Sequence, residues 1–249
     1  MTAQATRKAT RKAPRAPGQI RSLLRAVHPR QALAFAVVVG TLVALTGRPG
    51  REIAVSAVTV LVAQLIMGLL NDLLDLDRDR MGGAKNKPIA EGIIPPGNAS
   101  FAIAVLLLLV IPLSLQNGTQ AGLYVLATLV VGAVHNRWLH TTALSWVGWA
   151  VTFALLTFFV TYGGWGRDVD GSAPLTTFVV LCALLGVCVH FLTSLPDLVV
   201  DNQAGTKNLP LRVALRTGAP RLLVVAIAVT VVVVVAIVWT TAQAGAIAS

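Results

Sequence analysis

Residues 53–79 read IAVSAVTVLVAQLIMGLLNDLLDLDRD, an apolar run that ends in a closely spaced group of carboxylates. The part from 53 to 74 is long enough to cross a bilayer as one helix, which takes about 20 mostly apolar residues. Carboxylates at the end of such a helix cost free energy near lipid unless a partner neutralises them. The stretch therefore predicts a membrane helix with a polar site at one end.

The composition of the whole chain agrees with a membrane protein. Of its 249 residues, 55% are hydrophobic and only 12% are charged, and the mean hydropathy is +0.76. A soluble domain carries about 25% charged residues, so this chain has too few charges to cover a water-exposed surface. The composition excludes a secreted, nuclear or cytosolic globular enzyme.

Seven apolar runs are candidates for spanning helices, and none of them alternates as a β-strand would. We predict an all-α membrane protein of one domain, a multi-span bundle of about seven transmembrane helices around a central cavity. The runs cover approximately residues 31–46, 53–74, 99–115, 121–134, 144–162, 175–195 and 221–241. The transmembrane domain is expected over residues 29–245.

The distribution of basic residues predicts the orientation. The net charge is +10, and 17 of the 20 Lys and Arg residues lie in residues 1–30 or in and beside the loops around 75–98, 135–143 and 196–220. Arg48, Arg51 and Arg167 fall on the other side. By the positive-inside rule, the amino terminus of this multi-pass protein is cytoplasmic in the cell membrane. Residues 1–28 are expected to be a basic, disordered arm that contacts anionic lipid, not nucleic acid.

Six of the ten carboxylates lie in two short segments. In the first, Asp72, Asp75 and Asp79 are spaced i, i+3 and i+7, so they share one face of a helix, with Asn71 at its edge. Asp77 points elsewhere on the same helix. The three carboxylates are therefore expected to face a common cavity.

The second segment holds Asp197 and Asp201, an i, i+4 pair at the end of the sixth apolar run. Pro196 precedes the pair and predicts a kink in the helix. Ser194 and His190 lie on the same face one and two turns earlier. Two such segments at corresponding ends of two helices favour a shared site over a solvated acidic loop.

Crowded carboxylates near lipid need a positive partner, and Mg²⁺ is the natural one. It binds a few carboxylates, keeps some waters and takes further ligands from phosphate oxygens. Two clusters facing one cavity are suited to hold a diphosphate between bridging ions. Lys85 and Lys87 follow the first cluster and Lys207 follows the second, each placed to reach back to a diphosphate.

These motifs resemble those of the UbiA superfamily of intramembrane prenyltransferases. Asn71, Asp72, Asp75 and Asp79 match N-D-x-x-D-x-x-x-D, and Asp197 and Asp201 match D-x-x-x-D. Residues 85–92 (KNKPIAEG) and 204–210 (AGTKNLP) are similar to the usual sequels of the two motifs. The resemblance covers roughly residues 20–240.

The resemblance implies a Mg²⁺-dependent enzyme that transfers a prenyl or polyprenyl group from an isoprenyl diphosphate to a small-molecule acceptor, with an aromatic ring as one candidate. It implies that the five motif aspartates hold the metal and are catalytic. Asn71, Lys85, Lys87 and Lys207 would bind the donor, and the charge on the departing diphosphate would be stabilised electrostatically. Gln64, His190 and Arg137 are expected on the acceptor side.

Some features depart from the family pattern and leave alternatives open. The family usually has nine spans, whereas seven are predicted here, and Val199 and Val200 stand where relatives often carry another acid. Phosphoribosyl transfer to a lipid phosphate and isoprenoid cyclisation suit the same Asp and Lys residues. A third alternative is a non-enzymatic transporter or scaffold in which the carboxylates carry cations. Transport sites usually lie near the membrane midplane, so two clusters at one interface beside basic loops favour phosphate binding.

Overall fold

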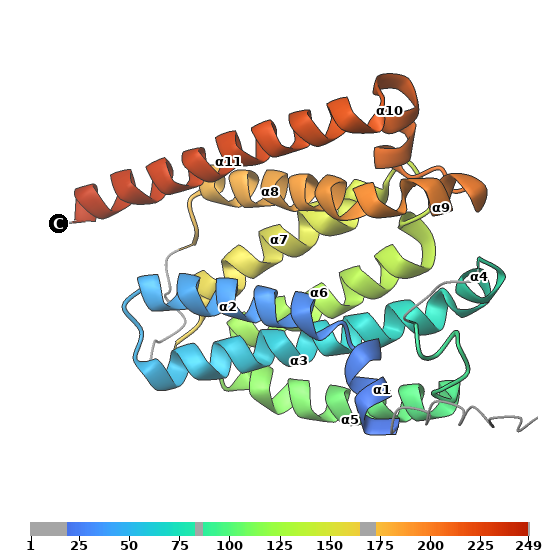
Figure 1. Ribbon diagram of the computed structural model, residues 1–249. Helices are drawn as coiled ribbons and strands as arrows, with labels where there is room; N and C mark the ends of the chain where they lie inside the picture. The colour runs from blue at the N-terminus through green and yellow to red at the C-terminus, as the bar shows by residue number, and fades with distance from the viewer. Residues whose placement is uncertain (1–18, 83–86, 165–172, 249) are drawn as a thin grey trace, which may run out of the picture.

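The computed structural model describes residues 19–82, 87–164 and 173–248, and these residues form helices and connecting turns without any β-strand (Figure 1). A π-helical turn, His135–Leu139, follows α6, and a 3₁₀ turn, Leu195–Asp197, follows α8. The α-helices are α1 Gln19–Ala26, α2 Pro29–Leu45, α3 Gly50–Leu74, α4 Leu76–Met81, α5 Pro96–Leu115, α6 Thr119–Val134, α7 Ser145–Tyr162, α8 Thr176–Ser194, α9 Leu198–Gln203, α10 Leu209–Thr217 and α11 Ala219–Ala248.

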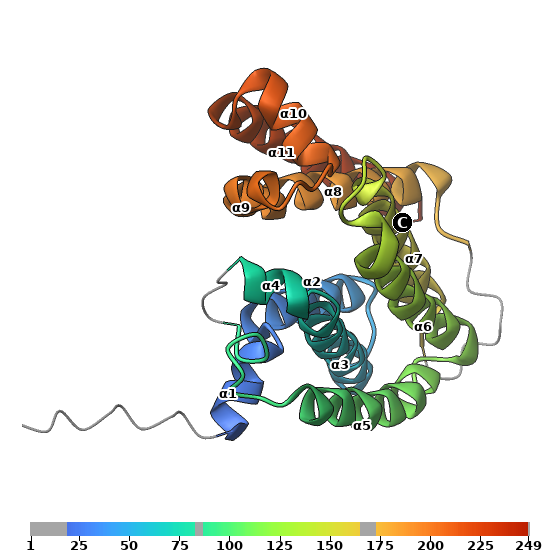
Figure 2. The ribbon, with the colours of Figure 1, turned by 90° about the vertical axis from the view of Figure 1, so that its right-hand side faces the viewer.

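The long helices pack side by side in chain order. Helix α2 packs against α3, α3 against α5, α6 against α7, α7 against α8, and α8 against α11. In the end-on view they follow an arc from α5 through α6, α7 and α8 to α11, with α2 and α3 along its inner side (Figure 2). The short helices α4 and α9 lie at the same end of the bundle (Figure 1), which we call the motif end.

In the part of the chain that the structure describes, five helices are long and apolar enough to cross a membrane: α3, α5, α7, the continuous segment Thr176–Gln203, and Ala219–Gln243 of α11. Helix α2 has 17 residues and α6 has 16, which falls short of the roughly 20 residues that a spanning helix takes. The predicted class, an all-α multi-pass membrane protein, is confirmed. The predicted count of seven spanning helices is not.

Close helix packing depends on residues that lack a side chain. A Cβ atom added at Gly186 of α8 would lie 2.5 Å from the Trp149 carbonyl oxygen of α7, and one added at Gly122 of α6 would lie 2.7 Å from that of Ser114 in α5. Because the lipid around membrane helices is as apolar as their side chains, the hydrophobic effect does not hold them together. Close approach of their backbones and the resulting packing do so instead.

A buried polar network ties the helices together at the end opposite the motif end. The Asn117 side chain accepts a hydrogen bond from Ser56 at 2.6 Å and donates to Thr59 at 2.9 Å. Its Nδ2 also donates to the carbonyl of Leu113, and its backbone carbonyl accepts from the Gly164 amide. One residue thus links α3, α5 and the end of α7, and its buried polar atoms are satisfied.

The amino-terminal segment joins the bundle earlier than the sequence predicted. We expected order from residue 29, yet α1 begins at Gln19, and Ser22, Ala26 and Val27 are buried. Gly68 of α3 makes this possible, because a Cβ there would lie 2.9 Å from the Val27 carbonyl oxygen. The rest of the predicted arm, residues 1–18, lies outside the described residues.

Candidate functional site

The first carboxylate group lies where α3 ends and α4 begins. Asp75 is both the C-cap residue of α3 and the N-cap residue of α4, and its ψ of 1° departs from helical geometry. Despite this break, the helical face persists: Asp72, Asp75 and Asp79 are 2%, 6% and 8% exposed, while Asp77 is exposed. Three buried carboxylates on one face require counter-charges.

Lys87 is the first counter-charge. Its Nζ lies 2.6 Å from Asp79 Oδ2 and 3.5 Å from Asp72 Oδ1. The chain returns to this position because Ile89 and Ile94, just beyond Lys87, are buried in a cluster with Leu69. The apolar anchoring of the loop therefore holds one ammonium between two carboxylates.

Three other side chains complete the group. Arg78 donates to Asp75 Oδ2 at 2.7 Å, and His140 Nε2 lies 3.4 Å from Asp75 Oδ1. His28 Nε2 lies 3.2 Å from Asp72 Oδ1. The second oxygen of Asp72, Oδ2, is buried and has no hydrogen-bond partner among the described residues.

The pKa values of these groups follow from burial opposed by charge. Burial raises the pKa of Asp75, but the hydrogen bond with His140 and the charge of Arg78 outweigh it, so the net pKa is lowered. Burial dominates at Asp79 and raises its pKa despite the bond from Lys87. Burial lowers the pKa of Lys87, yet the bond to Asp79 and the charge of Asp72 raise it overall, so Lys87 is a cation at neutral pH.

The second carboxylate pair lies on α9 and the turn before it. Asp197 ends the 3₁₀ turn that contains Pro196, so the predicted break in the helix is present. The charges of Lys87 and Arg78 act on Asp197, which places this residue on the side of the first group. Asp201 Oδ2 accepts a hydrogen bond from Asn208 at 2.7 Å.

The remaining predicted site residues lie at varied positions. His190 is buried, with Nε2 2.9 Å from Ser145 Oγ and its ring stacked on Trp149 at 5.8 Å. Gln64 and Asn71 of α3 are half-buried. Arg137 is exposed and lies over the Trp138 ring, 5.9 Å from its centroid. Lys85 lies outside the described residues.

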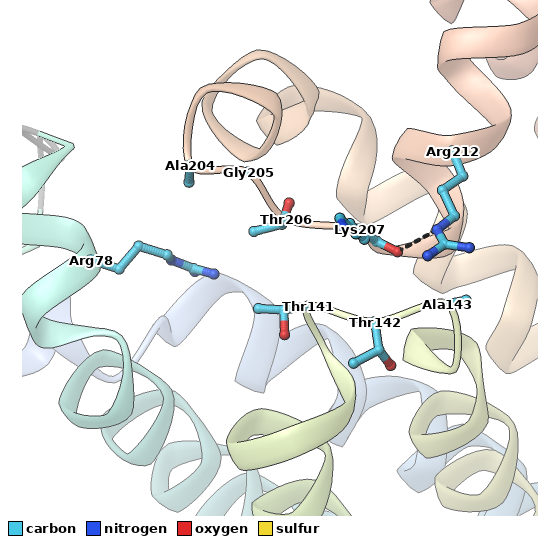
Figure 3. A pocket seen from close by; sticks show the side chains of 9 residues that line it. All are labelled: Arg78, Thr141, Thr142, Ala143, Ala204, Gly205, Thr206, Lys207 and Arg212. Atoms are coloured by element: carbon cyan, nitrogen blue, oxygen red, sulfur yellow. Dashed lines mark hydrogen bonds between the residues drawn. The ribbon is translucent and has the colours of Figure 1, made fainter.

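Lys207 does not contact the carboxylates. It lines a cavity of about 410 Å³ between α4, the turn before α7 and the loop before α10 (Figure 3). The polar side chains that line the cavity are those of Arg78, Thr141, Thr142, Thr206, Lys207 and Arg212. The cavity therefore adjoins the first carboxylate group through Arg78.

Sequence reasoning missed three members of the site: His28, Arg78 and His140. Arg78 carried a local signal, because it lies three residues after Asp75, the spacing at which helical side chains meet. His28 and Asp72 are 44 residues apart, and neither histidine belongs to a recognisable motif. Only the packing of α1 and of the turn after α6 against α3 brings the two histidines to the carboxylates.

Within the described ranges, no three histidine, cysteine or carboxylate side chains lie close enough together to hold a metal ion as they stand. The carboxylates of the first group are instead paired with Lys87, Arg78, His28 and His140. Metal binding at this group requires these side chains to release carboxylate oxygens.

Comparisons with known proteins agree on one family. The model of the UbiA prenyltransferase family matches residues 32–249. A solved UbiA homolog from Archaeoglobus fulgidus bound to GPP and Mg²⁺ is 17% identical, with a TM-score of 0.68 over 86% of this chain and 75% of that chain. The same homolog bound to DMAPP and Mg²⁺ is 18% identical, with a TM-score of 0.66 over the same shares.

A structure of digeranylgeranylglyceryl phosphate synthase is also similar. It is 18% identical, with a TM-score of 0.59 over 86% of this chain and 76% of that chain. At these identities the likeness shows a common fold. No curated protein matches the chain.

Proposed function

Because the chain belongs to the UbiA prenyltransferase family, we propose that it transfers a prenyl group from an isoprenyl diphosphate to a small-molecule acceptor at the motif end of the bundle. The observation that carries the proposal is the buried face of Asp72, Asp75 and Asp79 with Lys87 held against it. Similar structures bound to GPP and DMAPP with Mg²⁺ support the same donor class and cofactor here.

The residues of the site suit Mg²⁺. Its preferred ligands are oxygens, mainly carboxylates together with water and phosphate, and Asp72 Oδ2 is a buried acceptor without a partner among the described residues. Asp72, Asp75, Asp79, Asp197 and Asp201 would hold the ion, directly or through water. When bound, Mg²⁺ supplies positive charge that stabilises the departing diphosphate.

The chain's own cations share that task. Transfer breaks the bond between the allylic carbon and the diphosphate oxygen, and the electron pair leaves with the diphosphate. Lys87 lies where its ammonium can turn from Asp79 to a diphosphate oxygen, and Arg78 can turn from Asp75 in the same way. Asn71 and Lys85 belong to this donor side in our proposal.

The acceptor side lies deeper between the helices. The acceptor forms a new bond to the allylic carbon and loses a proton. His190 and Trp149 present a stacked ring pair with a hydrogen bond to Ser145, a wall suited to an acceptor that carries a planar or unsaturated group. Gln64 and Arg137 complete the acceptor-side residues that we propose, and the prenyl tail lies among the apolar helices.

The test is transfer by the purified protein in lipid nanodiscs. Radiolabelled geranyl diphosphate, Mg²⁺ and a panel of acceptors are expected to give a labelled product, and EDTA is expected to abolish it. A parallel reaction with labelled phosphoribosyl diphosphate serves as the matched control. Label transfer from phosphoribosyl diphosphate alone would contradict prenyl transfer.

A further inference from the structure

The cavity beside the first carboxylate group is open to solvent, and two of its lining residues, Lys207 and Arg212, are exposed. Its volume, about 410 Å³, falls in the range of small-molecule sites, roughly 300–1,000 Å³. Neither the five motif aspartates nor Lys87 line it. Arg78 alone is shared, because it pairs with Asp75 and also faces the cavity (Figure 3).

The cavity carries three positive charges and no negative one. Arg78, Lys207 and Arg212 line it, and its lining includes no Asp or Glu. Lys207 is fixed by its backbone: its amide donates to Thr141 O at 2.8 Å, and its carbonyl accepts from Arg212 Nε at 2.9 Å. No hydrogen bond or ion pair within the described ranges engages the Lys207 ammonium. Arg78 is already paired with Asp75, so Lys207 and Arg212 are the charges that an anion in the cavity would neutralise.

The lining also decides which anion fits. Thr141 adds a hydroxyl group, whereas the hydroxyls of Thr142 and Thr206 already donate to the carbonyls of Leu139 and Asp201. A hydroxyl with Arg and Lys side chains is a donor set that phosphate oxygens prefer. The only apolar side chains in the lining are those of Ala143 and Ala204. The charged ends of Lys207 and Arg212 therefore suit the cavity to a phosphate-bearing group.

We propose that this cavity binds the phosphate group of the acceptor, so that the acceptor is a phosphate-bearing molecule. The inference rests on the proposed function, in which the donor diphosphate meets the aspartates and Lys87 instead. Arg78 then stands between the two anions and can contact both. Lys207, expected from the sequence on the donor side, becomes part of the acceptor site.

The first test measures binding without turnover. The purified protein in EDTA is titrated with inorganic phosphate against chloride at equal ionic strength, and its Tm is followed. Phosphate is expected to stabilise the wild type, and Arg212→Gln or Lys207→Gln is expected to weaken this binding about tenfold, since each removes one charge-assisted bond. Arg216→Gln is the matched control, because Arg216 is on the same helix but outside the cavity lining. Absence of stabilisation, or equal loss in all three variants, would overturn the proposal.

A second titration separates the acceptor phosphate from the donor diphosphate. Phosphate binding is repeated with saturating Mg²⁺ and a non-cleavable thio analogue of geranyl diphosphate. If the cavity serves the acceptor, phosphate affinity stays within about twofold of its value without the analogue. Displacement of phosphate would show that the donor fills the cavity, which overturns the inference and leaves the proposed function intact. Failure of the analogue to bind with Mg²⁺ would instead count against the proposed function.

The third test uses matched acceptors, each with and without a phosphate group, and labelled geranyl diphosphate. Label is expected on the phosphate-bearing member of a pair. Arg212→Gln is expected to raise the KM for that acceptor about tenfold and to leave the KM for the donor unchanged. Equal labelling of the dephosphorylated member would refute a phosphate-bearing acceptor.

Discussion

At the scale of single residues, the difference between Asp75 and Asp77 tests the helical face. Asp75 is 6% exposed and faces Arg78 and His140, whereas Asp77 is exposed. Asp75→Asn is expected to lower Mg²⁺-dependent transfer by about 100-fold or more. Mutation of residues that only hydrogen-bond to metal ligands already lowers metal affinity or activity by about 10–100-fold. Asp77→Asn should stay within about threefold.

Steady-state rates over a range of Mg²⁺ concentrations check this pair of variants. The loss in Asp75→Asn should be partly recovered at high Mg²⁺, because the missing carboxylate weakens ion binding. Equal loss in the two variants would mean that the shared face does not define the site.

Lys87 gives the second prediction at this scale, because its ammonium competes for the oxygens that a metal ion would use. It lies 2.6 Å from Asp79 and 3.5 Å from Asp72. Lys87→Met is expected to weaken binding of the donor analogue about tenfold by removing a charge-assisted bond. The same change is expected to tighten binding of Mg²⁺ by the ligand-free protein, since one competing cation is gone.

Isothermal titration of each ligand measures the two effects of Lys87→Met separately. Lys207→Met is the matched control, because Lys207 lines the neighbouring cavity. If Lys87→Met weakens both metal and donor binding, Lys87 supports the carboxylates structurally and does not compete for them.

At the scale of helices, Gly68 determines how α1 and α2 meet α3. A Cβ on Gly68 would lie 2.9 Å from the Val27 carbonyl oxygen and 3.3 Å from the His28 ring. His28 adopts a left-handed φ of 49° at this junction, a conformation that costs a non-glycine residue free energy. The close approach of α3 to this junction places the His28 ring beside Asp72, with Nε2 3.2 Å from Oδ1.

Gly68→Ala is therefore expected to lower the free energy of unfolding by about 1–3 kcal/mol, the usual cost of overpacking, and to displace His28 from Asp72. Thermal unfolding in detergent measures the first effect, and the chemical shift of the His28 ring reports the second. Gly97→Ala serves as control, because a Cβ at Gly97 would have no atom within 4 Å beyond its chain neighbours and its own helix backbone. Equal behaviour of the two variants would contradict the packing argument.

The sequence predicted the helical elements well where the information is local. The spacing of Asp72, Asp75 and Asp79 places them on one face because helical periodicity depends only on neighbours, and Pro196 predicted the break before α9. Positions set by tertiary packing were missed. His28 reaches Asp72 across 44 residues, and the separation of Lys207 from the carboxylates follows from its backbone bond to Thr141.

At the scale of the whole molecule, the orientation in the membrane is the open prediction. We expect the motif end and the amino terminus to face the cytoplasm, because most basic residues lie on that side. The test uses a chain in which Cys182 and Cys188 are replaced by Ala. In that chain, the cysteine introduced by Asp77→Cys should react with an impermeant maleimide only in inside-out vesicles. A cysteine at Arg51 should react only in right-side-out vesicles. Labelling in the reverse pattern would place the site outside.

Helix length has a consequence for the surrounding bilayer. At 1.5 Å per residue, the 17 residues of α2 rise about 25 Å, less than a hydrocarbon core of about 30 Å, whereas the 30 residues of α11 rise about 45 Å. A bilayer around the protein would be expected to thin beside α2 and to accommodate the long α11 by tilt. Since α2 begins directly after His28, which contacts Asp72, such thinning would bring the water interface toward the carboxylates. Membrane thickness would then affect the site. In lipids with long acyl chains the carboxylates would lie closer to hydrocarbon, whereas in short-chain lipids they would stay hydrated.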